Sequence, residues 1–233
     1  MRLVLSNTTT TNTVDTHVYP SYIEKNSKVR IQSIVVPLSW YHINVNNYTL
    51  HFRDNAIDYV CLLTPGNYNI SDICIELKTR MDAASAETYT VTYNNSTGKL
   101  TIACTGNYEL LFSQSPDLAY ILGFLPGDTF IAASNTSRYP VKLNAQYITL
   151  ISENIEPISL NGAISNKIAI IPITKSVYTT QETIYCDIDM DIVLYNKLKI
   201  IKLYFEDEFG YIIEFNQSRF FITLEIQDLQ ASA

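Results

Sequence analysis

The alternation of apolar and polar positions is clearest between residues 88 and 125, where it predicts a hairpin followed by a short helix. Tyrosine and valine alternate with threonine over residues 89–93, and leucine, isoleucine and cysteine occupy every second position over residues 100–104. A period of two residues is typical of a half-buried strand, and the turn-forming sequence NNSTG separates the two segments. We therefore predict an antiparallel hairpin over residues 88–104.

Two segments have the helical period instead. Apolar residues of the first recur at helical spacing, at Ile70, Ile73, Cys74, Leu77 and Met81. Asn69 or Ser71 can cap its N-terminus. The second segment follows Ser115 as the expected N-cap, places Pro116 at the first helical position and ends at Gly123. We predict helices over residues 70–81 and 116–122, with the first packed against the hairpin.

Most of the remaining apolar runs have the length and composition of strands. They cover residues 28–38, 48–52, 59–64, 147–152, 167–173, 184–194, 198–205, 211–215 and 220–226. Residues 132–146 are mostly small and polar, which predicts a surface loop, and residues 206–210 are predicted to form an acidic hairpin turn. The whole pattern predicts a mainly β chain, a single jelly-roll β-sandwich with two short helices.

The first residues differ from the rest of the chain. Residues 6–16 are rich in threonine and asparagine and have little apolar surface to offset the entropy lost on ordering. We predict that residues 1–27 are an extended arm that gains order only by lying along another surface, with a small anchor of Val18, Tyr19, Tyr22 and Ile23 before the first core strand. Residues 28–233 are predicted to form a single jelly-roll domain, which includes a strand-helix-hairpin-helix unit at about residues 59–125.

Composition adds an expectation about partners. The 233 residues include 17 tyrosines and 9 phenylalanines, while only 17% are charged. Tyrosine supplies rigid contact area with a polar end, so this composition favours a surface that faces other protein. A formal net charge of −7 argues against a nucleic-acid-binding protein, which relies on lysine and arginine. No stretch approaches 18 uninterrupted apolar residues, so we expect neither a membrane span nor a standard secretory signal.

The residues that could carry chemistry are few. The histidines are His17, His42 and His51. His42 and His51 flank one predicted turn, but neither has a cysteine or carboxylate partner at metal-ligand spacing, so we expect structural roles. The four cysteines, Cys61, Cys74, Cys104 and Cys186, contain no C-x-x-C pair, and we expect free thiols.

Two acidic clusters complete this search. Asp187, Asp189 and Asp191 resemble the start of a calcium loop, but Ile192 stands where the loop needs glycine, which favours an alternating strand. The sequence leaves open whether this cluster binds a cation. The acidic residues 206–208 are expected at a solvated hairpin tip. Because the chain also has no G-x-S-x-G elbow and no Gly-rich phosphate loop, we predict no enzymatic activity, no cofactor and no metal site.

Four sequence blocks carry a resemblance to a known family. They are SIVVPLSWYHINVNNYTLHF (33–52), LTPGNYNISDICIELKTRM (63–81), the hairpin return TGKLTI with the helix SPDLAYILGF (97–102 and 115–124), and IDMDIVLYNKLKIIKLYFEDEFGYIIEFNQSRFFITLEIQDL (188–229). In this order they resemble the penton, or minor capsid, proteins of the polinton, adintovirus and virophage group of double-stranded DNA viruses. The resemblance covers about the whole chain.

This resemblance implies a structural virion protein that forms homopentamers at the fivefold vertices of an icosahedral capsid. Residues 28–233 would be its capsid domain, and the arm would reach a neighbouring subunit or the adjacent major capsid protein. Its implied partners are itself and the major capsid protein of the same virus, without nucleic acid, and its implied location is the capsid vertex, after assembly inside the host cell. An alternative of another class is a glycan- or receptor-binding β-sandwich of a virion spike. A third is a hydrolase on a β scaffold, for which the sequence has no nucleophile, metal or phosphate motif.

Overall fold

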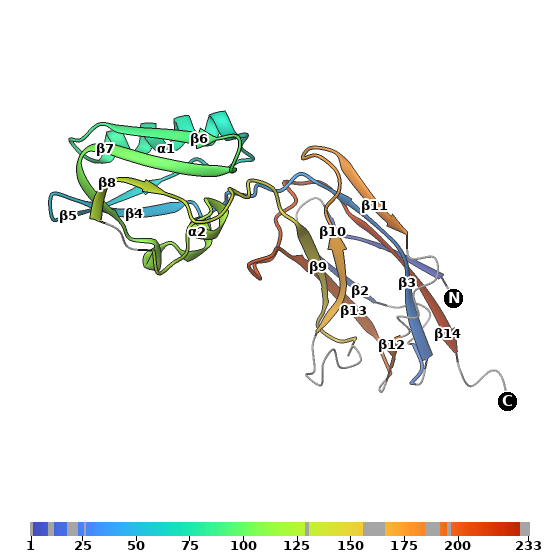
Figure 1. The fold of residues 1–233 in the computed structure, drawn as a ribbon. Coiled ribbons are helices and arrows are strands. Elements are labelled where there is room, and N and C mark those ends of the chain that lie inside the picture. The colour runs from blue at the N-terminus through green and yellow to red at the C-terminus, as the bar shows by residue number, and fades with distance from the viewer. Residues whose placement is uncertain are drawn as a thin grey trace. The chain divides into compact units, whose positions relative to one another are not determined.

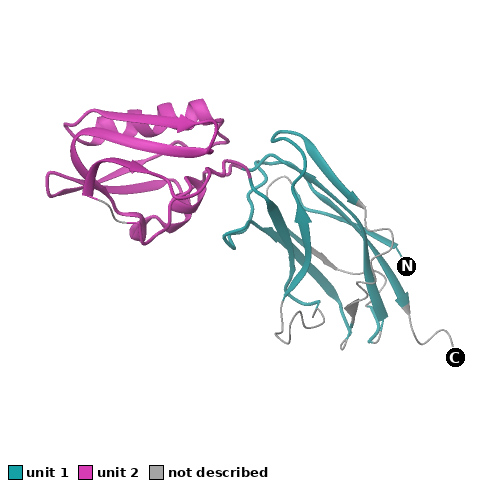
Figure 2. Cartoon of the chain, viewed as in Figure 1, with its two compact units in different colours: residues 1–40, 145–233 teal, residues 41–144 magenta. Residues whose placement is uncertain are grey.

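The protein is mainly β and folds into two compact units, which we call unit 1 and unit 2 (Figure 2). Unit 1 comprises Met1–Trp40 and Ala145–Ala233, and unit 2 comprises Tyr41–Asn144. The computed structural model describes residues 2–8, 12–17, 23–25, 27–128, 131–155, 166–184, 192–194 and 197–228. Over these residues the strands form three antiparallel sheets.

Unit 1 is built from two of these sheets (Figure 1). Its strands are β1 (Arg2–Ser6), β2 (Thr13–His17), β3 (Ser27–Pro37), β9 (Tyr147–Ser152), β10 (Lys167–Pro172), β11 (Thr180–Ile184), β12 (Ile192–Val193), β13 (Ile200–Glu206) and β14 (Phe221–Asp228). The sheet that we call the β3 sheet has the order β1-β14-β3-β11, with β12 also paired to β3. The β9 sheet has the order β10-β9-β13-β2.

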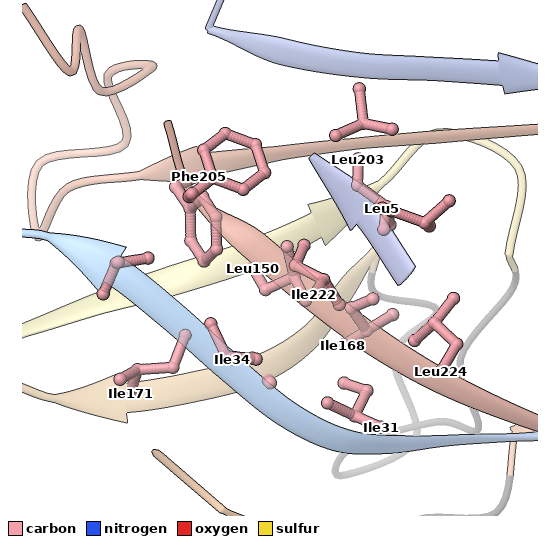
Figure 3. Close-up of a cluster of buried hydrophobic side chains, with 14 of the residues drawn as sticks. Leu5, Ile31, Ile34, Leu150, Ile168, Ile171, Leu203, Phe205, Ile222 and Leu224 are labelled. Carbon is pink, nitrogen blue, oxygen red and sulfur yellow. The ribbon is translucent and has the colours of Figure 1, made fainter. Parts of the chain in front are cut away.

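The two sheets of unit 1 share one apolar core (Figure 3). Buried residues occupy every second position along most of β3 and throughout β13, as the alternating pattern predicts. Ile34 and Ile222 from the β3 sheet and Leu150 and Phe205 from the β9 sheet are fully buried in this cluster. Because each sheet buries one face against the other, the predicted β-sandwich is confirmed.

The first described residues form edge strands of unit 1. β1 pairs with β14 in the β3 sheet, and β2 pairs with β13 in the β9 sheet. Leu5 and Val14 are buried in the core. Between the two strands the Nδ2 group of Asn7 donates to the carbonyl oxygen of Ser218 over 3.2 Å, and its Oδ1 accepts from the amide nitrogen of Phe220 over 2.8 Å.

This arrangement differs from the predicted extended arm. Residues 2–6 and 13–17 lie in the sheets of their own subunit, because Leu5 and Val14 bury apolar side chains on either side of the polar residues 6–12. Ile23 is also buried and forms a β-bridge with Leu198. The other predicted anchors, residues 18, 19 and 22, lie outside the described residues.

Unit 2 combines the third sheet with the helices. Its elements are β4 (Thr49–Asp54), β5 (Ile57–Leu62), α1 (Ile70–Ala84), β6 (Tyr89–Asn94), β7 (Lys99–Leu110), a 3₁₀ turn (Phe112–Gln114), α2 (Pro116–Ile121) and β8 (Ile131–Thr136). We call its sheet the β7 sheet; its order is β5-β4-β7-β6, and β8 also pairs with β7. The predicted hairpin and both predicted helices are confirmed.

Helix α1 covers one face of the β7 sheet and contacts β5 and β6 (Figure 1). The side chain of Asn69 accepts a hydrogen bond from the amide of Asp72 over 2.9 Å and so caps the helix start. Ile73, Leu77 and Met81 form its buried stripe. This face of the sheet and the stripe of α1 make a core that is separate from the core of unit 1.

The second helix is positioned differently from the prediction at its start. Pro116 is at the first turn as expected, but the side chain of Ser115 makes no capping bond. Its hydroxyl oxygen instead accepts from the amide nitrogen of His51 over 3.2 Å, which ties the helix start to β4. At the other end Gly123 has φ of 80°, and a Cβ atom here would collide with the carbonyl oxygen of Tyr139, so the helix ends at a position that only glycine fits.

The division into units also differs from the predicted single domain. Among the described residues, the apolar cluster of unit 1 contains none between 41 and 144, so the two units have separate cores. The predicted surface loop at residues 132–146 begins with β8, which pairs with β7. The predicted strand at residues 211–215 is reduced to one β-bridge between Glu206 and Ile212. Residues 185–191 of the predicted strand at 184–194 lie outside the described residues.

Candidate interaction surface

Of the histidines considered in the sequence, His42 has structural surroundings, and the side chain of His17 lies outside what the structure describes. His42 is buried, and its Nε2 donates to the carbonyl oxygen of Lys142 over 3.1 Å. Burial lowers the pKa of His42 to about 4, so the ring is neutral at pH 7. The backbone of His51 bonds Ser115 and Leu111. Within the described parts of the chain, no group of three or more histidine, cysteine, aspartate or glutamate side chains could hold a metal ion.

The predicted acidic turn is shaped by one of its own carboxylates. Asp207 Oδ1 accepts from the amide nitrogens of Phe209 and Tyr211, each over 2.9 Å. Burial raises the pKa of the neighbouring Glu206. Asp207 is therefore occupied by the turn that it stabilises. The cluster of residues 187, 189 and 191 lies outside the described residues.

The cysteines with a described position are free thiols. Cys61 is buried, and burial raises its pKa to about 12, so the thiol stays protonated at neutral pH. Burial also raises the pKa of Cys74 and of Cys104. Cys186 lies outside the described residues. These thiols are not activated nucleophiles, because an activated thiol needs a lowered pKa.

The β7 sheet has a face that α1 does not cover. Cys61 of β5 faces α1, where Glu76 and Arg80 act on its thiol. Side chains alternate along a strand, so Val60 and Leu62 lie on the opposite face. They are 52% and 49% exposed, although both are apolar.

The pairing register of β4 and β5 shows that the same face of the sheet continues on β4. Thr49, His51 and Arg53 of β4 lie directly opposite Leu62, Val60 and Asp58 of β5, and residues directly opposite each other share a face. We call the face formed by these six residues the open face. It is the main exposed apolar feature of the β4–β5 hairpin.

The charges of the open face are paired within the chain. Arg53 Nε lies 2.6 Å from Asp58, and its Nη1 lies 3.1 Å from Glu109 of β7. The hydrogen bond from Arg53 lowers the pKa of Asp58. The arginine therefore bridges three strands, and what remains exposed beside it is apolar.

The sequence pattern predicted this strand but not its open face. Residues 59–63 read YVCLL, a continuous apolar run that is typical of a strand buried on both faces. In the structure only the Cys61 side is buried, because one helix covers one face of the sheet. The exposed face could have been inferred from the position of residues 59–63 in the sequence. They form the second strand of a hairpin, and only one long helix follows to cover the sheet.

Comparisons with known proteins give matches in structure only. No protein-family model matches the chain, and no curated protein matches it. Among solved structures the chain is similar to the mavirus penton protein, with 10% identity, a TM-score of 0.47, and coverage of 97% of this chain and 99% of that chain. It is also similar to a chain in the cryo-EM structure of the Sputnik virophage, with 11% identity, a TM-score of 0.43, and coverage of 94% and 93%. None of the described helices is long and apolar enough to cross a membrane.

Proposed function

We propose that the protein is a structural virion protein, a penton or minor capsid protein that forms homopentamers at the fivefold vertices of an icosahedral capsid. Its partners in this proposal are four further copies of itself and the major capsid protein of the same virus. It acts by shape and contact and not by catalysis. Its location is the capsid vertex, where it arrives after assembly inside the host cell.

The observation that carries the proposal is the agreement between the sandwich and the sequence blocks that resemble pentons. The block at residues 33–52 includes the end of β3, the strand at the centre of its sheet, and the block at residues 188–229 supplies β12, β13 and β14. Two-sheet sandwiches of this kind are an architecture that viral capsids use. The other two blocks supply α1, part of the hairpin and α2 of unit 2.

Unit 1 also offers the two different surfaces that a ring needs. In a ring of identical subunits, one surface of each copy meets a second, different surface of the next copy. Among the side chains that the structure describes, the exposed apolar residues on the outer face of the β3 sheet are Val4 and Phe221. On the outer face of the β9 sheet they are Tyr147 and Ile170. We assign these two patches to the contacts between neighbouring subunits.

The mass of the purified full-length protein tests this proposal. We expect a species of five subunits in sedimentation and single-particle images of fivefold rings. Phe221→Asp and Ile170→Asp should each dissolve the ring, because a carboxylate would be buried without a partner. Ile131→Asp is the matched control, since Ile131 is an exposed residue of unit 2 outside both patches, and it should keep the ring.

A second measurement separates the proposal from the spike alternative. Co-expression with the major capsid protein of the same virus should place the chain in particles, at their vertices. A chain that stays monomeric at high concentration, is not incorporated, and binds a glycan on an array would contradict the vertex role. That result would favour a glycan-binding sandwich of a virion spike.

A further inference from the structure

The hydrogen-bond pattern of the β4–β5 hairpin leaves one edge of β5 without partners. The hairpin turns at Asn55 and Ala56, whose φ angles of 47° and 64° are those of a two-residue turn closed by a bonded pair. At the other end the amide of Leu63 donates to Tyr48 over 2.8 Å. Bonded and non-bonded pairs alternate in an antiparallel ladder. The backbone groups of residues 58, 60 and 62 therefore point away from β4, and within the described residues β5 pairs with β4 alone.

The same three residues carry the exposed side chains of the open face. Val60 and Leu62 are half-exposed apolar residues, and Asp58 is bound by Arg53. A strand edge with free backbone groups and apolar side chains is a template for pairing with another strand. The pairing partner would gain both backbone hydrogen bonds and apolar burial.

Two other edge strands, β10 and β6, carry features that oppose such pairing, whereas β5 does not. β10 has a register shift between Lys167 and Ala169 and ends at Pro172. On β6 the amide of Tyr89 is already bound to Asp82 Oδ1 over 2.7 Å. Lysine, proline and bulges are the usual means by which natural sheets protect an edge, and the sequence of β5 contains none of them.

The segment of β5 with unpartnered backbone groups has defined ends, and these ends set the register of a partner strand. Beyond Leu62 the amide of Thr64 donates to Glu76 Oε1 over 2.8 Å, and the carbonyl oxygen of Thr64 accepts from the hydroxyl of Tyr68. Before Asp58 the hairpin turn begins. The unpartnered segment therefore runs from 58 to 62 and is centred on Val60, so that its midpoint can lie on a twofold axis.

Charge also fits a second identical edge. Asp58 is paired with Arg53, and Glu76 is paired with Arg80 over 2.8 Å on α1. A second copy would meet no unpaired charge when it approached. A partner of strong charge would gain nothing from an edge whose charges are already neutralised.

We propose that β5 pairs antiparallel with β5 of a second copy of this chain across a twofold axis at Val60. Val60 then lies opposite Val60 of the second copy, and Asp58 lies opposite Leu62 of the second copy with its charge still held by Arg53. The two β7 sheets become one continuous sheet, with the Val60 and Leu62 side chains of both copies in contact on the open face. A twofold contact cannot close among five subunits, so it joins copies that belong to different rings.

Sedimentation of the full chain tests the contact. We expect a concentration-dependent species with twice the mass of the basic assembly in the wild type. Val60→Lys should remove it, and so should Val60→Pro, because proline deletes an amide that β4 does not use and edge strands tolerate it. Ile131→Lys, at a 73% exposed position on β8 of the same sheet, is the control and should keep it. Thermal melting of each variant establishes that unit 2 is folded.

Cross-linking tests the register. Val60→Cys places two thiols opposite each other, at a Cα separation of about 5.5 Å for a bonded pair, which suits a disulfide. Oxidation with copper phenanthroline should give a covalent dimer of Val60→Cys and not of Ile57→Cys, which is equally exposed but does not face itself. Equal masses for wild type and both folded Val60 variants would overturn the proposal. Absence of any five-subunit species would contradict the penton role instead, and a doubled species would then still support the β5 contact.

Discussion

The strands of units 1 and 2 have the same two-residue alternation of apolar and polar positions, but the two units differ in which apolar residues stay exposed. In unit 1 a second sheet covers the inner face of each sheet, so the apolar half of the alternation is buried in one shared core. In unit 2 a single helix covers one face of the β7 sheet, and the other face stays open with Val60 and Leu62 upon it. The number of covering layers, more than the pattern along a strand, decides which apolar residues stay exposed.

Large-to-small substitutions in each core have the largest expected effect, and they test whether the two units unfold independently. Phe205→Ala removes a ring that packs on Phe215 and Phe220 in unit 1, and Phe124→Ala removes one that packs on Phe112 in unit 2. Each should reduce the free energy of unfolding by about 3–5 kcal/mol. Calorimetry should show each variant lowering one transition only. A common shift of both transitions would mean that the units unfold together.

Removal of the first 12 residues tests whether β1 belongs to unit 1. The truncation deletes the strand that pairs with β14 and removes the buried Leu5. We expect unit 1 to lose about 2–4 kcal/mol of stability, while unit 2 is unaffected. Arg2→Ala, at an exposed position of the same strand outside both contact patches, is the control, and its effect should stay within about 0.5 kcal/mol. An unchanged melting temperature after truncation would restore the expectation of an arm without a role in folding.

The pH dependence of folding stability should differ between the two units. The pKa of His42 falls from 6.5 to about 4 on folding, so the unfolded state takes up a proton first as the pH falls. The stability from the neutral ring is fully present above pH 6.5 and is lost between pH 6.5 and about 4, by about 3 kcal/mol. The melting transition of unit 2 should therefore fall over this range. His42→Gln should remove this dependence, and a wild type without it would contradict the buried neutral ring.

A smaller and opposite effect is expected in the β4–β5 turn. Ala56 has a φ of 64°, where a Cβ atom is unfavourable. Ala56→Gly should stabilise unit 2 by about 0.5–1 kcal/mol, measured as a rise in denaturant midpoint at constant slope. Ala132→Gly on β8 is the control and should destabilise, because it adds backbone freedom without relieving a strained angle. A destabilised Ala56→Gly would mean that the turn has another conformation.

The smallest expected effect is that of a chelator. The described residues contain no metal-ligand cluster, and the acidic residues at 187, 189 and 191 are predicted to form a strand. Thermal melting with and without a strong chelator should agree for both transitions, because a ligand bound only to the folded state raises apparent stability. A large fall in melting temperature on chelation would identify the acidic cluster as a cation site.

The elements that sequence predicted well are those with a clear local signal. The hairpin has an unbroken two-residue period and a turn sequence, and α1 has an apolar stripe and a capping asparagine. The strands β1, β2 and β8 were missed because each has only five or six residues and pairs with a partner distant in sequence. The same limit hid the division into units, since nothing local distinguishes an apolar residue of one core from that of another.

The candidate surface was only partly predictable for a related reason. The strand at residues 59–64 was expected, but a continuous apolar run does not say which of its faces is covered. The histidines were expected to be structural and the cysteines to be free thiols; in the structure His42 and Cys61 are buried. Exposure is a property of the assembled layers, and no single segment specifies it.

The hydrogen bond between His42 and Lys142 joins residues close to the two ends of unit 2, and this affects unit 1 as well. To unit 1 the roughly 100 residues between Trp40 and Ala145 are one loop in its own chain. If that loop were unstructured, closing it would cost about 4 kcal/mol of chain entropy. A folded unit 2 with its ends tied together spares unit 1 most of this penalty. Protonation of His42 favours unfolding of unit 2 and therefore weakens the sandwich of unit 1, although His42 is not part of that sandwich.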